Sequence, residues 1–317
     1  MKILVTGCAG FIGFHLSKRL CELGEIVIGI DNLNDYYDRN LKLDRLKLLN
    51  KYLNFEFKEI DIINKDDLSN EFMFSNIDLV VNLAAQPGVR YSFNHPDSYI
   101  QTNIVGFSNV IELCREYKCK LIYASSSSVY GSDYNKSESE SIDSYTMNLY
   151  AATKICNEKI AEAYWSMHRQ KSIGLRFFSV YGPWGRPDML PYIVADGIRK
   201  HNKISVYNNG MMMRDYTYID DIIDGIIILM YNDKIDGAQI YNIGRGEPVL
   251  INDVISIIES NFDKSVDKHV IMVGNDCEAS VTEANIYKIK ELGYSPKVSI
   301  KEGLEKFCDW YKEYYKV

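Results

Sequence analysis

The sequence predicts an α/β fold, a doubly wound parallel sheet with a smaller, interleaved C-terminal lobe. Hydrophobic stretches at 2–5, 26–31, 55–60, 78–83, 120–124 and 172–177 alternate with amphipathic segments. That alternation is typical of a parallel sheet with helices on both faces. After Tyr181-Gly182-Pro183 the pattern breaks into loops and short elements. We therefore expect a sheet domain over 1–180, with a return near 214–230, and a second lobe over 181–317.

The first strand leads directly into a glycine-rich turn. Lys2-Ile3-Leu4-Val5 is followed by Thr6-Gly7-Cys8-Ala9-Gly10-Phe11-Ile12-Gly13 and then by an amphipathic segment. Glycines let the backbone approach a pyrophosphate, whose charge is stabilised by the N-terminus of the helix. The sheet is therefore expected to be of the Rossmann type. The expected cofactor-binding residues of this turn are Gly7, Gly10, Phe11, Ile12 and Gly13.

Asp31 ends the second predicted strand, 18 residues after Gly13. A carboxylate at that place can accept both ribose hydroxyls of NAD, and it would repel the additional phosphate of NADP. The sequence therefore predicts NAD as the cofactor.

Composition excludes several other classes of protein. The 317 residues are 46% hydrophobic and 25% charged with a net charge of −7, and no basic run could follow a nucleic-acid backbone. The seven cysteines are scattered without a C-x-x-C pair, which indicates neither a zinc site nor a disulfide framework. No apolar run approaches the roughly 20 residues of a membrane span. We expect a cytoplasmic protein with no metal, no membrane and no nucleic acid among its partners.

Tyr150 and Lys154 form the candidate catalytic pair. They are four residues apart, so on a helix their side chains project from one face. An ammonium beside a phenol stabilises the phenolate, and a phenolate can remove a proton from an alcohol.

The glycine spacing G-x-x-G-x-x-G together with Y-x-x-x-K resembles the extended short-chain dehydrogenase/reductase family, over nearly the whole chain. Asn82-Leu83-Ala84-Ala85-Gln86 resembles the turn beside the cofactor, and Ala124–Gly131 resembles the stretch with the active-site hydroxyl. The resemblance implies Tyr150, Lys154 and Ser126 as catalytic residues, with Lys154 also holding the nicotinamide ribose. The cofactor site is expected to include Asn32, Asp61, Ile62, Leu83, Ala84 and Ala85 as well.

Three serines favour one reaction within this family. Dehydratases of the family typically have Thr-Asp-Glu before Val-Tyr-Gly, because the expulsion of water requires an acid and a base. This chain has Ser126, Ser127 and Ser128 at those positions. With no carboxylate there, the simplest outcome is that the 4-keto sugar rotates in the site and the hydride returns to its other face. The sequence therefore favours an epimerase, an isomerase that uses NAD without consuming it.

Several segments resemble UDP-glucuronate 4-epimerases. They are Asp31–Asp38, Ala84–Ser92 and Arg176–Met189. The resemblance implies that Arg186 binds the sugar carboxylate, since its planar fork can hold two oxygens, and that Arg214 meets the diphosphate. The substrate-binding residues are expected to be Gln86, Arg90, Ser126, Ser127, Ser128, Ser179, Arg186, Arg214 and Asp276. The partners implied are a UDP-hexuronate and a second copy of the chain in a homodimer.

Alternatives remain open at this point. A nucleotide-sugar 4,6-dehydratase would use the same NAD site, and a 4-epimerase of another nucleotide sugar would use the same redox residues. A non-catalytic nucleotide sensor is a third class, although the chain keeps Tyr150, Lys154 and Ser126. Arg214 could instead form a charge pair with Asp215 on an edge strand.

Overall fold

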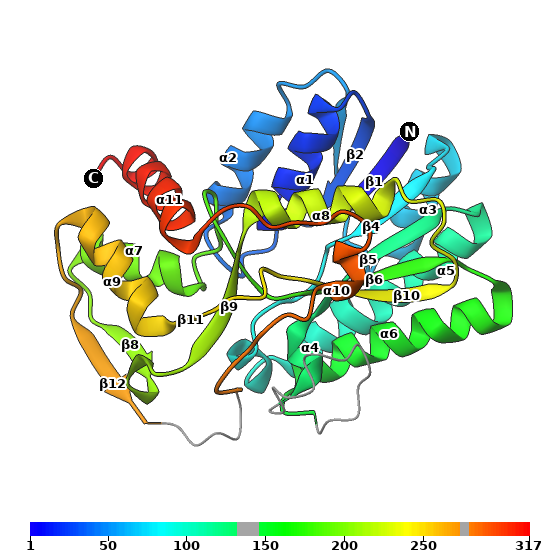
Figure 1. The fold of residues 1–317 in the computed structure, drawn as a ribbon. Helices are drawn as coiled ribbons and strands as arrows, with labels where there is room; N and C mark the ends of the chain where they lie inside the picture. The colour runs from blue at the N-terminus through cyan, green and yellow to red at the C-terminus, as the bar shows by residue number, and fades with distance from the viewer. Residues whose placement is uncertain (132–145, 273–278) are drawn as a thin grey trace. The chain divides into compact units, whose positions relative to one another are not determined.

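The computed structural model describes residues 1–131, 146–272 and 279–317 (Figure 1). The chain forms two compact units. Unit 1 comprises Met1–Val129, Asn148–Arg176 and Ile226–Tyr241, and unit 2 comprises Tyr130–Met147, Phe177–Gly225 and Asn242–Val317. The chain thus passes between the units several times.

Unit 1 is built on a seven-stranded sheet with the order β10-β6-β5-β4-β1-β2-β3. The registers of the pairs β1–β2, β2–β3, β1–β4 and β4–β5 are all parallel. The predicted doubly wound α/β fold is therefore confirmed. The strands are β1 (Lys2–Thr6), β2 (Ile26–Asp31), β3 (Phe55–Glu59), β4 (Leu79–Asn82), β5 (Lys120–Ser126), β6 (Ser172–Phe177) and β10 (Ala238–Ile243).

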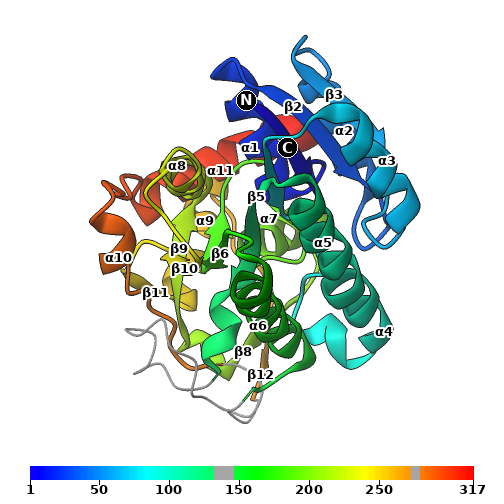
Figure 2. The same ribbon diagram turned by 90° about the vertical axis from the view of Figure 1, so that its right-hand side faces the viewer.

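Two groups of helices cover this sheet. α1 packs on β2 and α2, whereas α3 packs on α5 and α5 packs on α6, which run side by side in Figure 2. The core beneath the second group is aliphatic and aromatic, with Leu4, Ile30, Val80 and Phe107 buried together. The helices of unit 1 are α1 (Phe11–Glu22), α2 (Arg39–Leu49), α3 (Lys65–Ser75), α4 (Pro96–Tyr99), the π-helix η2 (Ile100–Gly106), α5 (Phe107–Tyr117) and α6 (Leu149–His168), with short 3-10 turns η1 (Arg90–Phe93) and η3 (Ser127–Tyr130).

Unit 2 contains two small sheets. β9 (Met213–Tyr218) is central in the first, parallel to β7 (Ser179–Tyr181) and antiparallel to β11 (Pro248–Leu250). β8 (Ile204–Tyr207) pairs with β12 (Lys268–Ile271) in the second. The helices α7 (Leu190–Lys200), α9 (Ile251–Phe262) and α11 (Ile300–Tyr315) pack on one another (Figure 1). The remaining elements of unit 2 are α10 (Tyr287–Lys290) and the 3-10 turn η5 (Asn208–Gly210), while α8 (Ile219–Met230) begins in unit 2 and ends in unit 1.

None of the helices in the described ranges is long and apolar enough to cross a membrane.

Candidate active site

The glycine turn between β1 and α1 has no room for side chains. Gly7 has φ +68°, and a Cβ there would lie 2.9 Å from the backbone nitrogen of Ala84. A Cβ on Gly13 would overlap the carbonyl oxygen of Gly7, and one on Gly10 would lie 2.9 Å from that oxygen. The three glycines are therefore required by the close approach of the backbone, which a phosphate-binding turn needs.

No side chain of the described residues caps the N-terminus of α1. Gly10 is the N-cap and provides no side-chain hydrogen bond, and the first turn carries no acidic residue. Phe11 is buried and Ile12 is half-buried, so these two residues fix the helix start while its N–H groups remain available to an anion.

Asp31 lies at the end of β2 and faces the glycine turn. Its carboxylate accepts hydrogen bonds from the backbone N–H groups of Ala9 (3.2 Å) and Leu33 (2.9 Å). Burial raises the pKa of Asp31, and the Lys42 ammonium 3.9 Å away opposes that rise. The carboxylate is thus oriented by backbone donors where the ribose of a dinucleotide is expected.

Asn32 directly follows Asp31, whereas Asp61 and Ile62 follow β3. The Asn32 Nδ2 donates to Asp61 Oδ2 (2.8 Å), which ties the segment after β2 to the segment after β3. Ile62 is buried against Gly106, where a Cβ would lie 2.7 Å from the Ile62 side chain.

Leu83, Ala84 and Ala85 are half-buried and follow β4. The Thr6 hydroxyl accepts a hydrogen bond from the backbone N–H of Ala84 (3.0 Å) and donates to the Asn82 side chain (2.6 Å). Our sequence analysis did not single out Thr6, although its place immediately before Gly7 was a usable signal.

Tyr150 and Lys154 lie one turn apart on α6. The Asn148 side chain caps this helix by accepting from Ala151 N (2.9 Å), which fixes the turn with Tyr150. Lys154 is 3% exposed, its Nζ donates to the carbonyl oxygen of Ala124 (2.8 Å), and it lies 5.9 Å from the centre of the Tyr150 ring. Burial lowers the pKa of Lys154 to about 8, and the nearby Glu158 carboxylate limits that fall.

The hydroxyls of Ser126 and Ser128 interact at the end of β5. Ser126 Oγ donates to Ser128 Oγ (3.1 Å) and accepts from the backbone N–H of Ser128 (3.1 Å). Ser126 is buried, whereas Ser127 and Ser128 are half-buried on η3. A polar, hydroxyl-lined strand end thus belongs to the same unit as Tyr150 and Lys154.

Asn103 connects Gln86 to α6 and was missed by the sequence analysis. It accepts from Gln86 N (2.8 Å), and its Nδ2 donates to Gln86 O (3.1 Å) and to Thr153 Oγ1 (3.0 Å). Asn157 Nδ2 in turn donates to Asn103 O (2.6 Å). The π-helical geometry of η2 was not predictable from the surrounding residue pattern, and this network depends on it.

In unit 2 the planar fork of Arg186 is held by a carboxylate. Arg186 Nε donates to Asp188 Oδ1 (2.9 Å), and a second bond joins Nη2 to Oδ2. Both side chains are partly exposed. The observed pair demonstrates that this guanidinium can grip a carboxylate with two parallel bonds. Ser179 begins β7 and is half-buried.

Arg214 and Asp215 are neighbours on β9 with different roles. Arg214 is half-buried, and its Nη1 donates to the backbone oxygen of Met213 (2.8 Å). Asp215 is fully buried and accepts from Arg245 N (2.9 Å), Gly246 N (2.8 Å), Ala284 N (3.0 Å) and Thr217 Oγ1 (3.1 Å). β9 is the central strand of its sheet, so the expected alternative of a pair on an edge strand is not what the fold provides, and the Asp215 carboxylate is bonded to backbone donors and Thr217.

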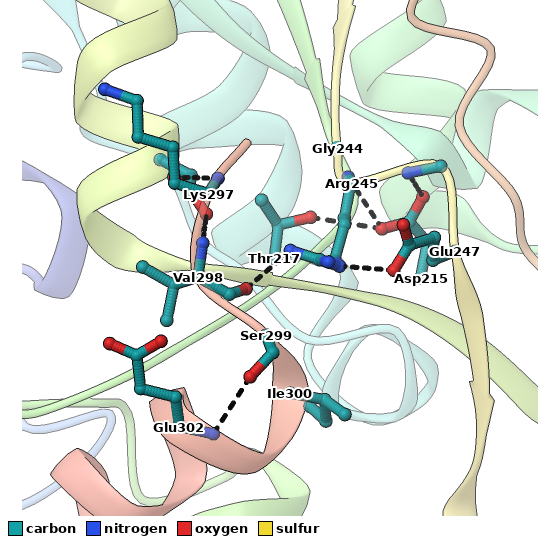
Figure 3. Close-up of polar contacts among 12 residues, drawn as sticks. Asp215, Thr217, Gly244, Arg245, Glu247, Lys297, Val298, Ser299, Ile300 and Glu302 are labelled. Carbon is teal, nitrogen blue, oxygen red and sulfur yellow. Dashed lines mark hydrogen bonds and ion pairs between the residues drawn. The ribbon is translucent and has the colours of Figure 1, made fainter. Parts of the chain in front are cut away.

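Figure 3 shows how the turn after β10 is anchored. Arg245 Nη1 donates to the backbone oxygen of Val298 (2.6 Å), and its Nε donates to Glu247 (2.7 Å). The next residue, Ser299, caps α11 by accepting from Glu302 N (3.3 Å). Asp215 and Arg245 thus link β9, this turn and the start of α11.

Two further residues were predicted to bind the substrate, Arg90 and Asp276. Arg90 begins η1 and is exposed. Asp276 lies outside the described residues.

The residues of unit 1 fit a dinucleotide. The glycine turn excludes side chains, α1 presents an uncapped N-terminus and Asp31 presents an oriented carboxylate. Across residues 1–131, 146–272 and 279–317, no group of three or more His, Cys, Asp or Glu side chains could hold a metal. The arrangement has a phenol, a buried ammonium and a hydroxyl for proton transfer at an alcohol.

Comparison with known proteins agrees with this arrangement. Residues 3–244 match the model of the NAD dependent epimerase/dehydratase family. The chain is 44% identical to Protein CapI of Staphylococcus aureus, with all of both chains covered. It is 40% identical to UDP-glucuronate 4-epimerase 4 of Arabidopsis thaliana, covering 99% of this chain and 76% of that one. The UDP-glucuronic acid 4-epimerase of Bacillus cereus, solved with UDP-glucuronic acid and NAD, is 35% identical with a TM-score of 0.93, covering 99% of this chain and 100% of that one.

Proposed function

Because the chain belongs to the NAD dependent epimerase/dehydratase family, we propose that it interconverts UDP-glucuronate and UDP-galacturonate by inverting carbon 4 of the sugar. The observation that carries this proposal is the set of Tyr150, Lys154 and Ser126 in one unit, with hydroxyls where dehydratases need carboxylates. The likeness to UDP-glucuronate 4-epimerases over the full length supports the choice of substrate.

Tyr150 is the base in this proposal. Its phenolate takes the proton from the hydroxyl on carbon 4 and returns it after inversion. The Lys154 ammonium stabilises the phenolate, and Ser126 donates a hydrogen bond to the reacting oxygen. NAD, when bound, supplies reversible oxidation at carbon 4 and is unchanged over a full cycle.

In this proposal Arg186 prevents the loss of carbon dioxide from the intermediate. A 4-keto glucuronate is a β-keto acid, which loses carbon dioxide when its carboxylate is free to align with the ketone. A two-bonded grip such as the one that Arg186 makes on Asp188 would hold that carboxylate in place. Ser127, Ser128, Ser179, Gln86 and Arg90 complete the proposed sugar contacts, and Arg214 and Asp276 the proposed nucleotide contacts.

The cofactor site proposed for NAD consists of Gly7, Gly10, Phe11, Ile12, Gly13, Asp31, Asn32, Asp61, Ile62, Leu83, Ala84 and Ala85, together with Tyr150 and Lys154. Substitution of Gly13 by Val should abolish the retention of NAD during purification, since a side chain there meets the Gly7 carbonyl. Absorbance of the released nucleotide measures that retention.

We also propose that the protein works in the cytoplasm as a homodimer and supplies hexuronate for a cell-surface polysaccharide. A UDP-linked hexuronate is a chemically suitable donor for such a polymer. The apolar content of Ile155–Tyr164 on α6 is compatible with a contact to a second copy, although Ile160 and Tyr164 also pack against the core of unit 1. A mass near that of one chain, 36.5 kDa, in sedimentation equilibrium would contradict the dimer.

The test is incubation with UDP-glucuronate and no added cofactor, followed by proton NMR of the sugar. Galacturonate signals are the expected result. A 4-keto-6-deoxy product from UDP- or GDP-linked hexoses would instead favour the dehydratase, and turnover of another nucleotide sugar would change the substrate only. Tyr150→Phe should lose about 10³-fold in rate, within the range for removal of a general base.

A further inference from the structure

A buried ion pair lies beside the proposed catalytic lysine. Glu158 is 7% exposed and Arg176 is 1% exposed. Arg176 Nε donates to Glu158 Oε1 (2.9 Å), and its Nη2 donates to Oε2 (2.8 Å). Neither residue belongs to the proposed reaction, and a buried ion pair by itself is often no more stable than well-packed apolar side chains. Stability alone therefore does not account for this pair.

The pair continues into the strand that carries the proposed active-site hydroxyl. Ser125 on β5 is 2% exposed and its hydroxyl donates to Glu158. The preceding residue, Ala124, accepts the hydrogen bond from Lys154 (2.8 Å). Consecutive residues of β5 thus contact Lys154 and Glu158, which are one turn apart on α6. The next residue of β5 is Ser126.

Lys154 and Glu158 are four residues apart, so their side chains lie on one face of α6 and both contacts join that face to β5. These contacts add to those that α6 makes with Asn103 through Thr153 and Asn157. Because α6 carries Tyr150 and β5 carries Ser126, the contacts through Ala124 and Ser125 join the two elements that carry these proposed catalytic side chains.

Glu158 also determines the charge near Lys154. The other ionisable groups around Lys154 and Glu158 are Tyr123 on β5, Glu162 on α6 and Arg176 on β6. Tyr150 and Tyr99 of α4 lie toward the start of α6. Glu158 is the charge that acts directly on Lys154, raising its pKa against the effect of burial. Arg176 balances Glu158 in turn, so that the buried pair is neutral.

We infer that Glu158, held by Arg176 and Ser125, is a positioning residue for the proposed catalytic centre: it sets the placement of α6 on β5 and keeps an anion beside the Lys154 ammonium. The inference rests on the proposed function for the roles of Tyr150, Lys154 and Ser126. It assigns Glu158 no contact with substrate or cofactor.

The electrostatic half is tested on the purified holoenzyme without substrate. NMR of the Lys154 Cε resonance in lysine-labelled protein, assigned with Lys154→Arg, follows ionisation directly. Glu158→Gln should lower the Lys154 pKa by about one pH unit, a typical effect of changing one nearby charge. Arg176→Met should raise it, and the double variant should return toward the parent value. A parent-like titration in Glu158→Gln, or equal shifts in the single and double variants, would overturn the inference.

The positional half uses Ser125→Ala, which removes one buried hydroxyl and keeps every charge. The expected result is a several-fold loss of kcat for UDP-glucuronate with unchanged KM and an unchanged Lys154 titration. Ser172→Ala is the matched control, since Ser172 on β6 is equally buried and its hydroxyl has no hydrogen-bond partner among the described residues. Equal kcat in Ser125→Ala and Ser172→Ala would overturn the positional role.

These outcomes separate from the proposed function. If the parent enzyme does not turn over UDP-glucuronate, the substrate proposal fails, yet the NMR titrations still decide the role of Glu158. If Glu158→Gln does not fold, Arg176→Met and the double variant, which has no unpaired buried charge, still give the comparison.

Discussion

Lys154 in unit 1 and Asp215 in unit 2 are both buried charges, but they differ in how many hydrogen bonds their surroundings provide. Lys154 is 3% exposed, and its ammonium, which has three donors, makes one hydrogen bond to residues that the structure describes. Asp215 is 0% exposed and accepts four hydrogen bonds, three of them from backbone N–H groups. The saturated charge joins segments of the fold, whereas Lys154 is the charge that we propose to act on the cofactor and on Tyr150.

The two sites also differ in what burial costs. Burial lowers the pKa of Lys154 from 10.5 to about 8, a shift equivalent to about 3 kcal/mol. This cost is fully present below pH 8, where the buried ammonium is charged, and it is relieved as pH rises toward the pKa of the unfolded state. A group that costs stability is a candidate for function.

The largest expected effect is that of Lys154→Met. The rate with UDP-glucuronate should fall about 10³-fold, because the base loses its cation, while thermal unfolding should shift to higher temperature by the equivalent of about 1–3 kcal/mol. Calorimetry and product NMR measure the two changes. A variant that is both less stable and fully active would reverse the assignment of Lys154 to function.

Asp215→Asn should give the opposite combination. An amide nitrogen replacing one oxygen would face backbone donors, at a cost of about 2–3 kcal/mol in the free energy of unfolding. The kcat of the folded fraction should change little. Urea unfolding measures the loss, with Asp309→Asn on the exposed face of α11 as control. Equal stability of the two variants would mean that the Asp215 network contributes nothing.

The pH dependence tests the charge of Lys154. Since the ammonium is required and its pKa is about 8, kcat/KM should fall above that pH, by up to tenfold per unit. Lys154→Arg should be slower but should keep its rate at alkaline pH, since arginine stays protonated. An alkaline decline shared by both enzymes would have another origin.

Arg186→Lys is expected to have the smallest effect. Losing the two-bonded grip should raise KM for UDP-glucuronate about five-fold, near 1 kcal/mol. Inhibition by UDP, which has no sugar carboxylate, should be unchanged and serves as the control. An equal weakening of UDP would move Arg186 from the sugar to the nucleotide.

Much of the fold was predictable because its signals are local. Buried strands of a parallel sheet are continuous apolar runs, and the glycines of the first turn are fixed by backbone overlap at Gly7 and Gly13. The ends of β2 and β6 were therefore located from hydrophobicity alone. The pairing of Tyr150 with Lys154 follows from helical spacing.

The supporting residues could not be predicted because their partners are distant in sequence. Asn103 is 50 residues from Thr153, and Asp215 is 69 residues from Ala284. Glu158 was invisible for the same reason, since Arg176 and Ser125 belong to different strands. Local sequence pattern identifies the proposed catalytic side chains, whereas the residues that support them are identified only from the tertiary structure.

The most direct test of the proposed chemistry follows a deuterium label on carbon 4 of UDP-glucuronate. The account predicts UDP-galacturonate that keeps the deuterium on carbon 4 in ordinary water, because the same hydrogen leaves and returns within one closed site. Product with hydrogen at carbon 4 would show exchange with solvent and would contradict an inversion by oxidation and return.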